Sequence, residues 1–193
     1  MKIRISRGGI ANVILEFVQS IVLALSVFVL LYLFVAQPNQ IDGRSMDSTF
    51  ANGEYVITDK LTYKFREPKR GEVVVFKAPA TEPCAETECE YIKRIIAVGG
   101  DRIKVEKGNI YINDELVDQS FLNPGIKSDP GQFLQEGVEK TIENDFFICL
   151  GDNRPYSRDS REFGPIPKRD IVGRAIFKYW PVSSVGLVPK VKI

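Results

Sequence analysis

An apolar run near the N-terminus limits what this chain can fold into more than any other feature. Phe17 to Val35 is a run of 19 residues, FVQSIVLALSVFVLLYLFV, interrupted only by one glutamine and two serines. As a helix rising about 1.5 Å per residue, the run is about 28 Å long, close to the ~30 Å hydrocarbon core of a bilayer. The run therefore predicts a transmembrane helix, which we place at residues 13–36.

The alternative for this run is a cleaved signal peptide. Such peptides have an apolar core of about 7–15 residues and end in a small-x-small exit. Here the run is longer, and the residue two positions before Ala36 is Phe34, which is not small. We therefore expect an uncleaved signal-anchor helix that makes the lipid bilayer a partner of this protein.

Charge predicts how the helix is oriented. The chain has 26 basic and 25 acidic residues, and its net charge of +1 gives no hint of a nucleic-acid partner. Lys2, Arg4 and Arg7 precede the apolar run, and basic flanks of a membrane span stay in the cytoplasm. We expect residues 1–12 to be cytoplasmic and residues 37–193 to form a domain outside the cytoplasm.

Short β-rich runs separated by turn residues follow the helix, with no helical periodicity of useful length after residue 40. Strands are expected within residues 54–59, 69–79, 90–101, 101–117, 145–153 and 170–181. Residues 37–43, QPNQIDG, are interpreted as a short linker, and residues 118–140 as a long loop. The expected fold is mainly β: one N-terminal transmembrane helix and an all-β, barrel- or sandwich-like domain.

Ser45, in GRSMDSTF (residues 43–50), is a candidate nucleophile on a short polar stretch. The sequence contains no histidine, which excludes a Ser-His-Asp triad. Lysine can replace histidine as the base only when it is neutral, a form that burial favours by lowering the lysine pKa. Ser45 comes nine residues after Ala36, so it lies at most ~30 Å from the helix end along an extended chain.

Lys93 is the lysine with the most apolar surroundings, in YIKRIIAVGG (residues 91–100). In a strand it shares a face with Tyr91 and Ile95. Its rival is Lys77, which lies at the end of an expected strand where water should reach it. The alternative role for Lys93 is that of an ordinary surface lysine on an edge strand.

The three cysteines have different predicted roles. Cys84 and Cys89 bracket the polar stretch CAETEC, and a disulfide between them is permitted outside the cytoplasm. The alternative is two free thiols in a loop. Cys149, in FFICL, is interpreted as a small buried hydrophobic residue. With no histidine and only three cysteines, no metal site is expected.

Four motifs occur in a fixed order after the apolar run: GRSMDSTF, RGEVVVFK, YIKRIIAVGGD and GDNRPYSRDSREFG. Over about residues 10–181 the chain resembles type I signal peptidase (leader peptidase, peptidase family S26), a membrane-bound Ser/Lys protease family. This resemblance implies a bacterial-type cell membrane, signal-peptide-bearing preproteins as substrates, and acyl transfer without a metal or cofactor. By the same resemblance, Ser45 is the nucleophile and Lys93 the general base.

The resemblance also assigns supporting roles within GDNRPYSRDSREFG. Ser157 would hydrogen-bond the lysine amine and orient it. Asp159 and Arg161 would form a supporting ion pair, and Asp152 and Asn153 would shape the turn near the site. We expect these residues to support the chemistry rather than to carry it out.

Shallow pockets for small side chains at the first and third positions before the cut are a further implication of the resemblance. The candidate pocket residues are Ile41, Met46, Phe50, Val75, Tyr91 and Ile92. The alternative role for each of them is packing in the core.

The chain departs from the family pattern at two positions. Ser48 stands where the family usually has proline. Gly43 stands where some members have a serine whose hydroxyl helps the oxyanion hole, and other members also have glycine there. The oxyanion hole would then use the backbone N–H of Ser45 and a second donor that the sequence does not identify.

Two other functions remain as alternatives. One is a relative that uses a Ser/Lys dyad for self-cleavage, but such repressors carry a DNA-binding domain where this chain has a membrane helix. The other is a non-catalytic, membrane-anchored β module or pseudo-protease. The presence of Ser45, Lys93 and Ser157 together argues against it. Nothing in the sequence indicates an oligomeric state.

Overall fold

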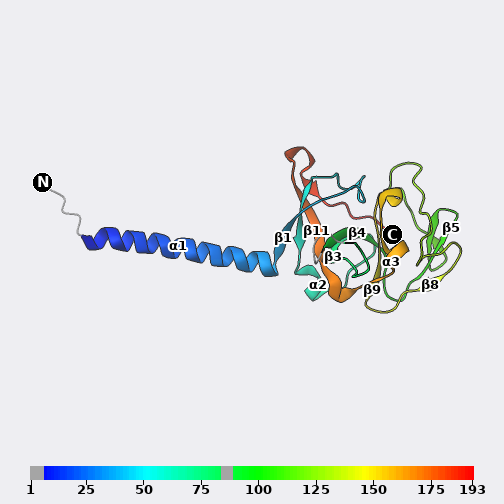
Figure 1. Ribbon diagram of the computed structural model, residues 1–193, viewed down its shortest axis with the longest axis horizontal. Helices are drawn as coiled ribbons and strands as arrows, with labels where there is room; N and C mark the ends of the chain where they lie inside the picture. Colours follow the sequence, from blue (N-terminus) through cyan, green and yellow to red (C-terminus); the bar gives the residue numbers. More distant parts are fainter. Residues whose placement is uncertain (1–6, 84–88) are drawn as a thin grey trace. The chain divides into compact units, whose positions relative to one another are not determined.

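The computed structural model describes residues 7–83 and 89–193 and divides the chain into two units, Met1–Ala36 and Gln37–Ile193. The first unit contains one helix, α1 (Arg7–Phe34), which Figure 1 draws in blue. Within the described residues, the stretch Gly9–Phe34 is the one helix long and apolar enough to cross a membrane. The predicted N-terminal helix is therefore confirmed, and it begins earlier than the expected residue 13.

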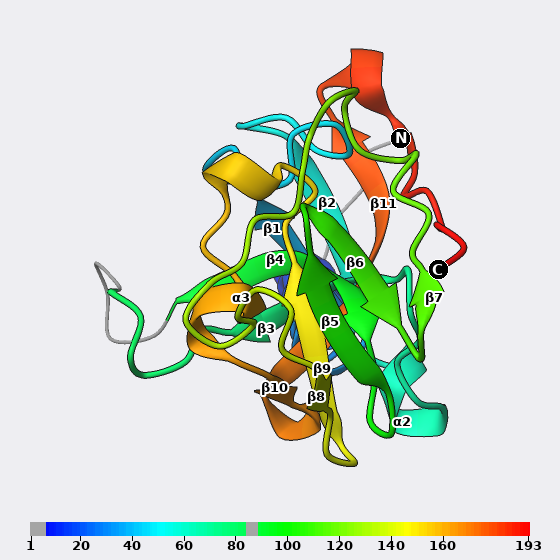
Figure 2. The ribbon, with the colours of Figure 1, turned by 90° about the vertical axis from the view of Figure 1, so that its right-hand side faces the viewer.

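The second unit is an antiparallel β domain built from two sheets (Figures 1 and 2). The larger sheet has the strand order β1-β2-β11-β3-β4-β9-β10, and β12 pairs with β11. Its strands are β1 (Ala36–Gln40), β2 (Tyr55–Asp59), β3 (Val73–Lys77), β4 (Glu90–Ala97), β9 (Phe146–Leu150), β10 (Ile166–Pro167), β11 (Ile171–Trp180) and β12 (Gly186–Leu187). The predicted mainly-β fold is confirmed.

The smaller sheet has the order β7-β6-β5-β8, and Figure 2 shows β5 and β6 side by side at its centre. Its strands are β5 (Arg102–Glu106), β6 (Asn109–Ile112), β7 (Glu115–Leu116) and β8 (Lys140–Thr141). Between β7 and β8 the described chain forms neither helix nor strand, which confirms the loop predicted for residues 118–140 except at Lys140, the first residue of β8.

Short helical turns connect the strands, and none was predicted. They are α2 (Thr62–Phe65), η1 (Arg154–Tyr156), α3 (Ser160–Phe163), η2 (Lys168–Asp170) and η3 (Val182–Ser184). The turn α3 begins after Asp159, whose side chain accepts a hydrogen bond from the backbone N–H of Arg161. This cap fixes the chain immediately after Ser157, so it also positions the candidate site.

The predicted linker at residues 37–43 is wrong in part, because its beginning is strand β1, which lies next to β2 in the sheet. AQPNQ carries no β-branched or aromatic residue, so its local pattern does not indicate a strand. Pro38 cannot donate to a sheet ladder, but β1 is the end strand of its sheet, where proline is tolerated.

The strand β4 lies centrally and contributes to all three apolar clusters of the domain. Ile96 packs in the cluster that includes the small sheet, Ile95 packs with Cys149, and Ile92 packs against the cluster of Ile41 and its neighbours. Cys149 is fully buried and free, as expected of a small hydrophobic residue. A polar side chain on this strand is therefore surrounded by core packing.

Candidate active site

A groove of about 280 Å³ separates the segment around β1 from the first half of β4. Its lining residues are Asn39, Gln40, Ile41, Asp42, Gly43, Arg44, Ser45, Val75, Glu90, Tyr91, Ile92, Lys93, Tyr156 and Arg158. One edge of β4 pairs with β3 from Glu90 to Arg94, but pairing of the other edge with β9 begins only at Arg94. The groove therefore borders a stretch of β4 whose second edge lacks a strand partner in the described structure.

The structure brings Ser45 and Lys93 together on the groove wall. Lys93 Nζ lies 2.8 Å from Ser45 Oγ and donates a second hydrogen bond of 3.0 Å to the carbonyl oxygen of Ile92. Ser45 belongs to a turn, whereas Lys93 is held rigidly in β4 and is only 4% exposed. The two groups lie within proton-transfer distance, as a nucleophile and its base must.

Burial lowers the pKa of Lys93 to about 8. The negative charges of Asp159 and Asp152 and the thiol of Cys149 act in the opposite direction, but their effect is smaller than that of desolvation. Nζ also lies 5.1 Å from the centroid of the Tyr91 ring, consistent with the expected shared strand face. A substantial fraction of Lys93 is therefore neutral at mildly alkaline pH. The rival Lys77 is exposed.

The turn that carries Ser45 contains two residues with positive φ. Gly43 has a φ of +100°, a conformation that strains any side chain, so the glycine suits this turn. Ser48 has a φ of 98°, whereas proline would require a φ near about −65°. The proline usual in the family could not adopt the conformation that this chain has at Ser48.

Asn153 joins this turn to the loop that follows β9. Its backbone N–H donates to the carbonyl of Ser45 (3.0 Å), and its side-chain Nδ2 donates to the carbonyl of Arg44 (2.9 Å) and to Asp47 Oδ2 (3.3 Å). Asn153, which was predicted to shape this turn, thus contacts Asp47 and the two carbonyl groups on either side of the Ser45 α-carbon.

Asp152 forms a buried ion pair with Arg94. Arg94 Nη2 lies 2.7 Å from Asp152 Oδ2 and Nε lies 2.9 Å from Oδ1, and both side chains are 0% exposed. Thr49 Oγ1 donates a further hydrogen bond of 2.6 Å to Asp152. Asp152 therefore braces its loop against β4 and against the chain after Ser45, on the face of β4 opposite Lys93.

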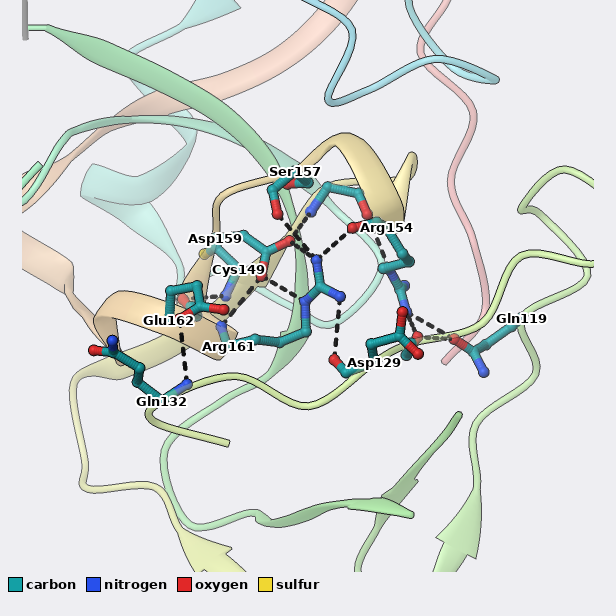
Figure 3. A network of polar contacts seen from close by, with 12 residues as sticks. Gln119, Asp129, Gln132, Cys149, Arg154, Ser157, Asp159, Arg161 and Glu162 are labelled. Atoms are coloured by element: carbon teal, nitrogen blue, oxygen red, sulfur yellow. Dashed lines mark hydrogen bonds and ion pairs between the residues drawn. The ribbon is translucent and has the colours of Figure 1, made fainter. Parts of the chain in front are cut away.

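Figure 3 shows the network around the Asp159–Arg161 ion pair, which is present as predicted. The two Arg161–Asp159 contacts measure 2.8 and 3.0 Å. Arg161 Nη2 also donates to the carbonyls of Arg154 (2.7 Å) and Ser157 (3.1 Å), and Asp159 accepts from the N–H of Gly151 (3.1 Å). The guanidinium thereby holds both ends of the segment from Arg154 to Ser157.

The expected hydrogen bond from Ser157 to the lysine amine is not formed. Ser157 Oγ is buried and has no hydrogen-bond partner among the described residues. Lys93 Nζ bonds instead to the carbonyl of Ile92, its own neighbour in β4. Ser157 Oγ is packed so closely against Gly151 that a Cβ at this glycine would lie 2.2 Å from it and 2.4 Å from the Ser45 carbonyl oxygen.

Arg154 is a buried residue of the site that sequence reasoning missed. Its Nε donates to the carbonyl of Gly151 (2.9 Å), and its Nη1 donates to Gln119 Oε1 (2.7 Å) and to Ser128 Oγ. Burial lowers the pKa of Arg154 to about 10. An arginine directly after GDN was visible in the sequence, but its partners lie in the long loop and have no local signal.

The predicted pocket residues separate into two groups. Ile41, Val75, Tyr91 and Ile92 line the groove. Met46 and Phe50 do not: they are 0% and 1% exposed and pack in the core cluster of Ile41. Their placement on the pocket wall is therefore corrected to a position in the core. The predicted Cys84–Cys89 disulfide involves residue 84, which lies outside the described residues.

Comparison with known proteins places the chain in a family. The family described as "Signal peptidase, peptidase S26" matches residues 14–180. A "Probable signal peptidase I-2" from Synechocystis sp. is 34% identical over 177 residues, covering 92% of this chain and 78% of that protein. A "Signal peptidase IB" from Staphylococcus aureus is 33% identical over 182 residues, covering 89% of this chain and 92% of that protein.

Among solved structures, a signal peptidase I from Enterococcus faecalis aligns with a TM-score of 0.44 and 21% identity. The alignment covers 56% of this chain and 97% of that one. The family match spans most of the sequence, including the strand of Lys93 and the turn of Ser45. This chain therefore belongs to the signal peptidase family, peptidase S26, and is a serine protease.

Proposed function

We propose that this protein is a membrane-anchored signal peptidase that removes N-terminal signal peptides from exported preproteins, with Ser45 as nucleophile and Lys93 as general base. The observation that carries the proposal is the 2.8 Å contact between Ser45 Oγ and a buried lysine amine. The signal peptidase relatives support the choice of substrate.

Acylation begins when neutral Lys93 Nζ takes the proton of Ser45 Oγ as this oxygen bonds to the scissile carbonyl carbon. Negative charge develops on the carbonyl oxygen, where the backbone N–H of Ser45 stabilises it. The carbon–nitrogen bond then breaks, and the Lys93 ammonium gives its proton to the leaving amine. The mature protein leaves, and the signal peptide remains as an ester on Ser45.

Deacylation uses the same two side chains. Lys93, neutral again, takes a proton from a water molecule whose oxygen attacks the ester carbonyl. The bond from the carbonyl carbon to Oγ breaks, and the Lys93 ammonium returns the proton to Ser45. The signal peptide leaves as a carboxylic acid, and the enzyme is restored.

The groove is suited to an extended peptide. β1 is an end strand, and among the described residues no strand pairs with the groove-facing edge of β4 from Glu90 to Lys93. An extended substrate segment would add a strand between these edges, with backbone hydrogen bonds providing affinity. Ile41, Val75 and Ile92 lie on the groove wall. The substrate side chains that point toward these three residues would have to be small.

The orientation of the chain completes the proposal. The basic N-terminus would remain in the cytoplasm and residues 37–193 outside, on the side to which preproteins are exported. Because the chain from Ala36 to Ser45 is short, the nucleophile would stay near the lipid surface at which signal peptides are cut.

The proposal is tested by measuring how fast the purified full-length enzyme and its variants cleave a preprotein substrate. Ser45→Ala and Lys93→Ala should each abolish cleavage, and the double variant should be no slower than either single one because the two groups act as a unit. The exposed Lys77 provides a matched control, since Lys77→Ala should retain activity. Cleavage by Lys93→Ala at a rate close to wild type would show that another group is the base.

A further inference from the structure

We infer that Asn153 is a positioning residue that aims the oxyanion-stabilising N–H of Ser45. The inference rests on the proposed function, because it takes Ser45 as the nucleophile. Asn153 is 6% exposed and is not among the groove-lining residues, so it would act through the backbone rather than on the substrate.

Asn153 binds the peptide groups on both sides of the nucleophile's α-carbon. Its Nδ2 lies 2.9 Å from the carbonyl oxygen of Arg44, and its backbone N–H donates to the carbonyl of Ser45 at 3.0 Å. The Arg44 carbonyl also accepts from the N–H of Asp47 at 3.1 Å. Both peptide planes that flank Ser45 are therefore fixed by one buried residue.

Because the peptide group is planar, holding the Arg44 carbonyl in place also fixes the direction of the Ser45 N–H. In a trans peptide the N–H points opposite to the preceding carbonyl, within the same plane. Because the Arg44 carbonyl is turned toward Asn153, the N–H of Ser45 is turned away from it. No residue in the described parts of the chain accepts a hydrogen bond from this N–H. It therefore remains a donor for a developing oxyanion, with a direction set by Asn153.

The chemistry of the contacts requires an amide at position 153. The two partners of Nδ2, the Arg44 carbonyl and Asp47 Oδ2, are both acceptors, so only a donor fits between them. Asp47 also accepts from Arg44 Nε at 3.0 Å. A carboxylate at position 153 would have nearly the same shape, but it would lose both donor contacts and place a second negative charge beside Asp47.

The position of Asn153 is itself held from both sides in the chain. Its neighbour Asp152 is pinned by the buried pair with Arg94, and its other neighbour Arg154 is buried against the Gly151 carbonyl. The Asn153 carbonyl accepts from the N–H of Tyr156 at 3.0 Å. A side chain this restrained can hold a peptide plane through the catalytic cycle without being reoriented.

The test compares Asn153→Asp with wild type, using Asn123→Asp as the matched control because Asn123 is exposed in the long loop. Three quantities are measured: kcat and KM for a signal-peptide substrate, and Ki for a peptide aldehyde of the same sequence. The aldehyde adds Ser45 Oγ to its carbonyl carbon and so forms a tetrahedral oxyanion. For Asn153→Asp we expect kcat to fall roughly 10- to 100-fold, KM to change less than about threefold, and Ki to rise in proportion to the loss of kcat/KM.

Three outcomes would overturn the inference while the wild type remains active. These are wild-type kinetics in Asn153→Asp, a rise in KM alone, or a fall in kcat with an unchanged aldehyde Ki. A shifted midpoint of the pH–rate profile would overturn the inference as well, because it would show that Asn153 acts through Lys93. If Asn153→Asp does not fold, Asn153→Ala removes the donor without adding charge and carries the same test. Absence of cleavage by the wild type would count against the proposed function, not against the role of Asn153.

Discussion

Gly151 shows how tightly single residues are packed around Ser45. A Cβ added at Gly151 would contact both the Ser45 carbonyl oxygen and the buried hydroxyl of Ser157. Gly151 donates its N–H to Asp159 and offers its carbonyl to Arg154. One glycine therefore connects the turn of Ser45, the Asp159–Arg161 ion pair and the buried Arg154, and a methyl group has no space there.

We predict that Gly151→Ala lowers kcat at least about 100-fold, since a Cβ at 2.2 Å from Ser157 Oγ would displace either Ser157 or the Ser45 backbone. Overpacking of this kind also costs about 1–3 kcal/mol of stability. Steady-state kinetics and thermal melting measure the two effects. Gly186→Ala is the control, because a Cβ there meets no atom within 4 Å. Wild-type kinetics in Gly151→Ala would contradict the packing described.

The surroundings of a single residue could be predicted from the sequence where they depend on its neighbours in the same strand. Lys93 could be selected because apolar residues flank it in the strand, and burial is what lowers its pKa. The partners of Arg94 could not be predicted, because Thr49 and Asp152 come from segments far away in the chain. Because side chains alternate along a strand, Arg94 lies on the face of β4 opposite Lys93, but this alternation does not indicate that Asp152 and Thr49 contact its side chain there.

At the scale of elements, the long loop between β7 and β8 is clamped to the loop after β9. Arg154 reaches Gln119 and Ser128, Arg161 Nη1 donates to the Asp129 carbonyl, and the N–H of Phe133 donates to the Arg161 carbonyl. Figure 3 shows the contacts of Arg154 with Gln119 and of Arg161 with Asp129. The long loop thus helps to hold the segment from Arg154 to Arg161 in place, although it contributes no residue to the groove lining.

We predict that Arg154→Leu lowers the melting temperature and exposes residues 118–131 to limited proteolysis. The substitution removes the Arg154 hydrogen bonds to the Gly151 carbonyl, Gln119 and Ser128, and a buried acceptor left without a donor costs about 1–3 kcal/mol. Thermal melting and mass spectrometry of the fragments provide the measurements. Arg169→Leu removes an 86% exposed arginine and should change neither quantity. An unchanged melting temperature in Arg154→Leu would show that the clamp does not stabilise the loop.

Elements with a clear local pattern were predicted from sequence, namely α1, the β-branched strands and the long loop. β1 was missed because AQPNQ forms a strand only through its pairing in the sheet. The two-residue strands β8, β10 and β12 are also too short to carry a periodicity. These misses share a physical cause: tertiary pairing, and not local propensity, determines those segments.

At the scale of the whole molecule, the apolar helix would anchor the chain in the membrane, and the β domain would carry the residues of the proposed reaction. The helix has no acidic residue in its first turn and no basic residue in its last. The orientation proposed here comes from the basic residues before the helix. Residues 37–193 would then be exposed on the outer face of the membrane.

Protease added to intact cells should therefore digest the β domain and spare a tag fused to the N-terminus. The basic flank retains the N-terminus in the cytoplasm, where the added protease cannot reach it. Immunoblots against the tag and against the β domain measure the outcome, and detergent-lysed cells, in which both signals should disappear, are the control. Protection of residues 40–193 in intact cells would reverse the orientation and remove the export role with it.

The central claim is that Lys93 acts as a neutral base, and the pH dependence of kcat/KM tests it most directly. Only the neutral amine can accept the Ser45 proton, and burial lowers the pKa of Lys93 to about 8. Activity should therefore rise about tenfold per pH unit below that pKa and level off above it, and Lys93→Arg should be inactive because guanidinium keeps its proton. A flat profile from about pH 6 to 10, with chemistry rate-limiting, would contradict the claim.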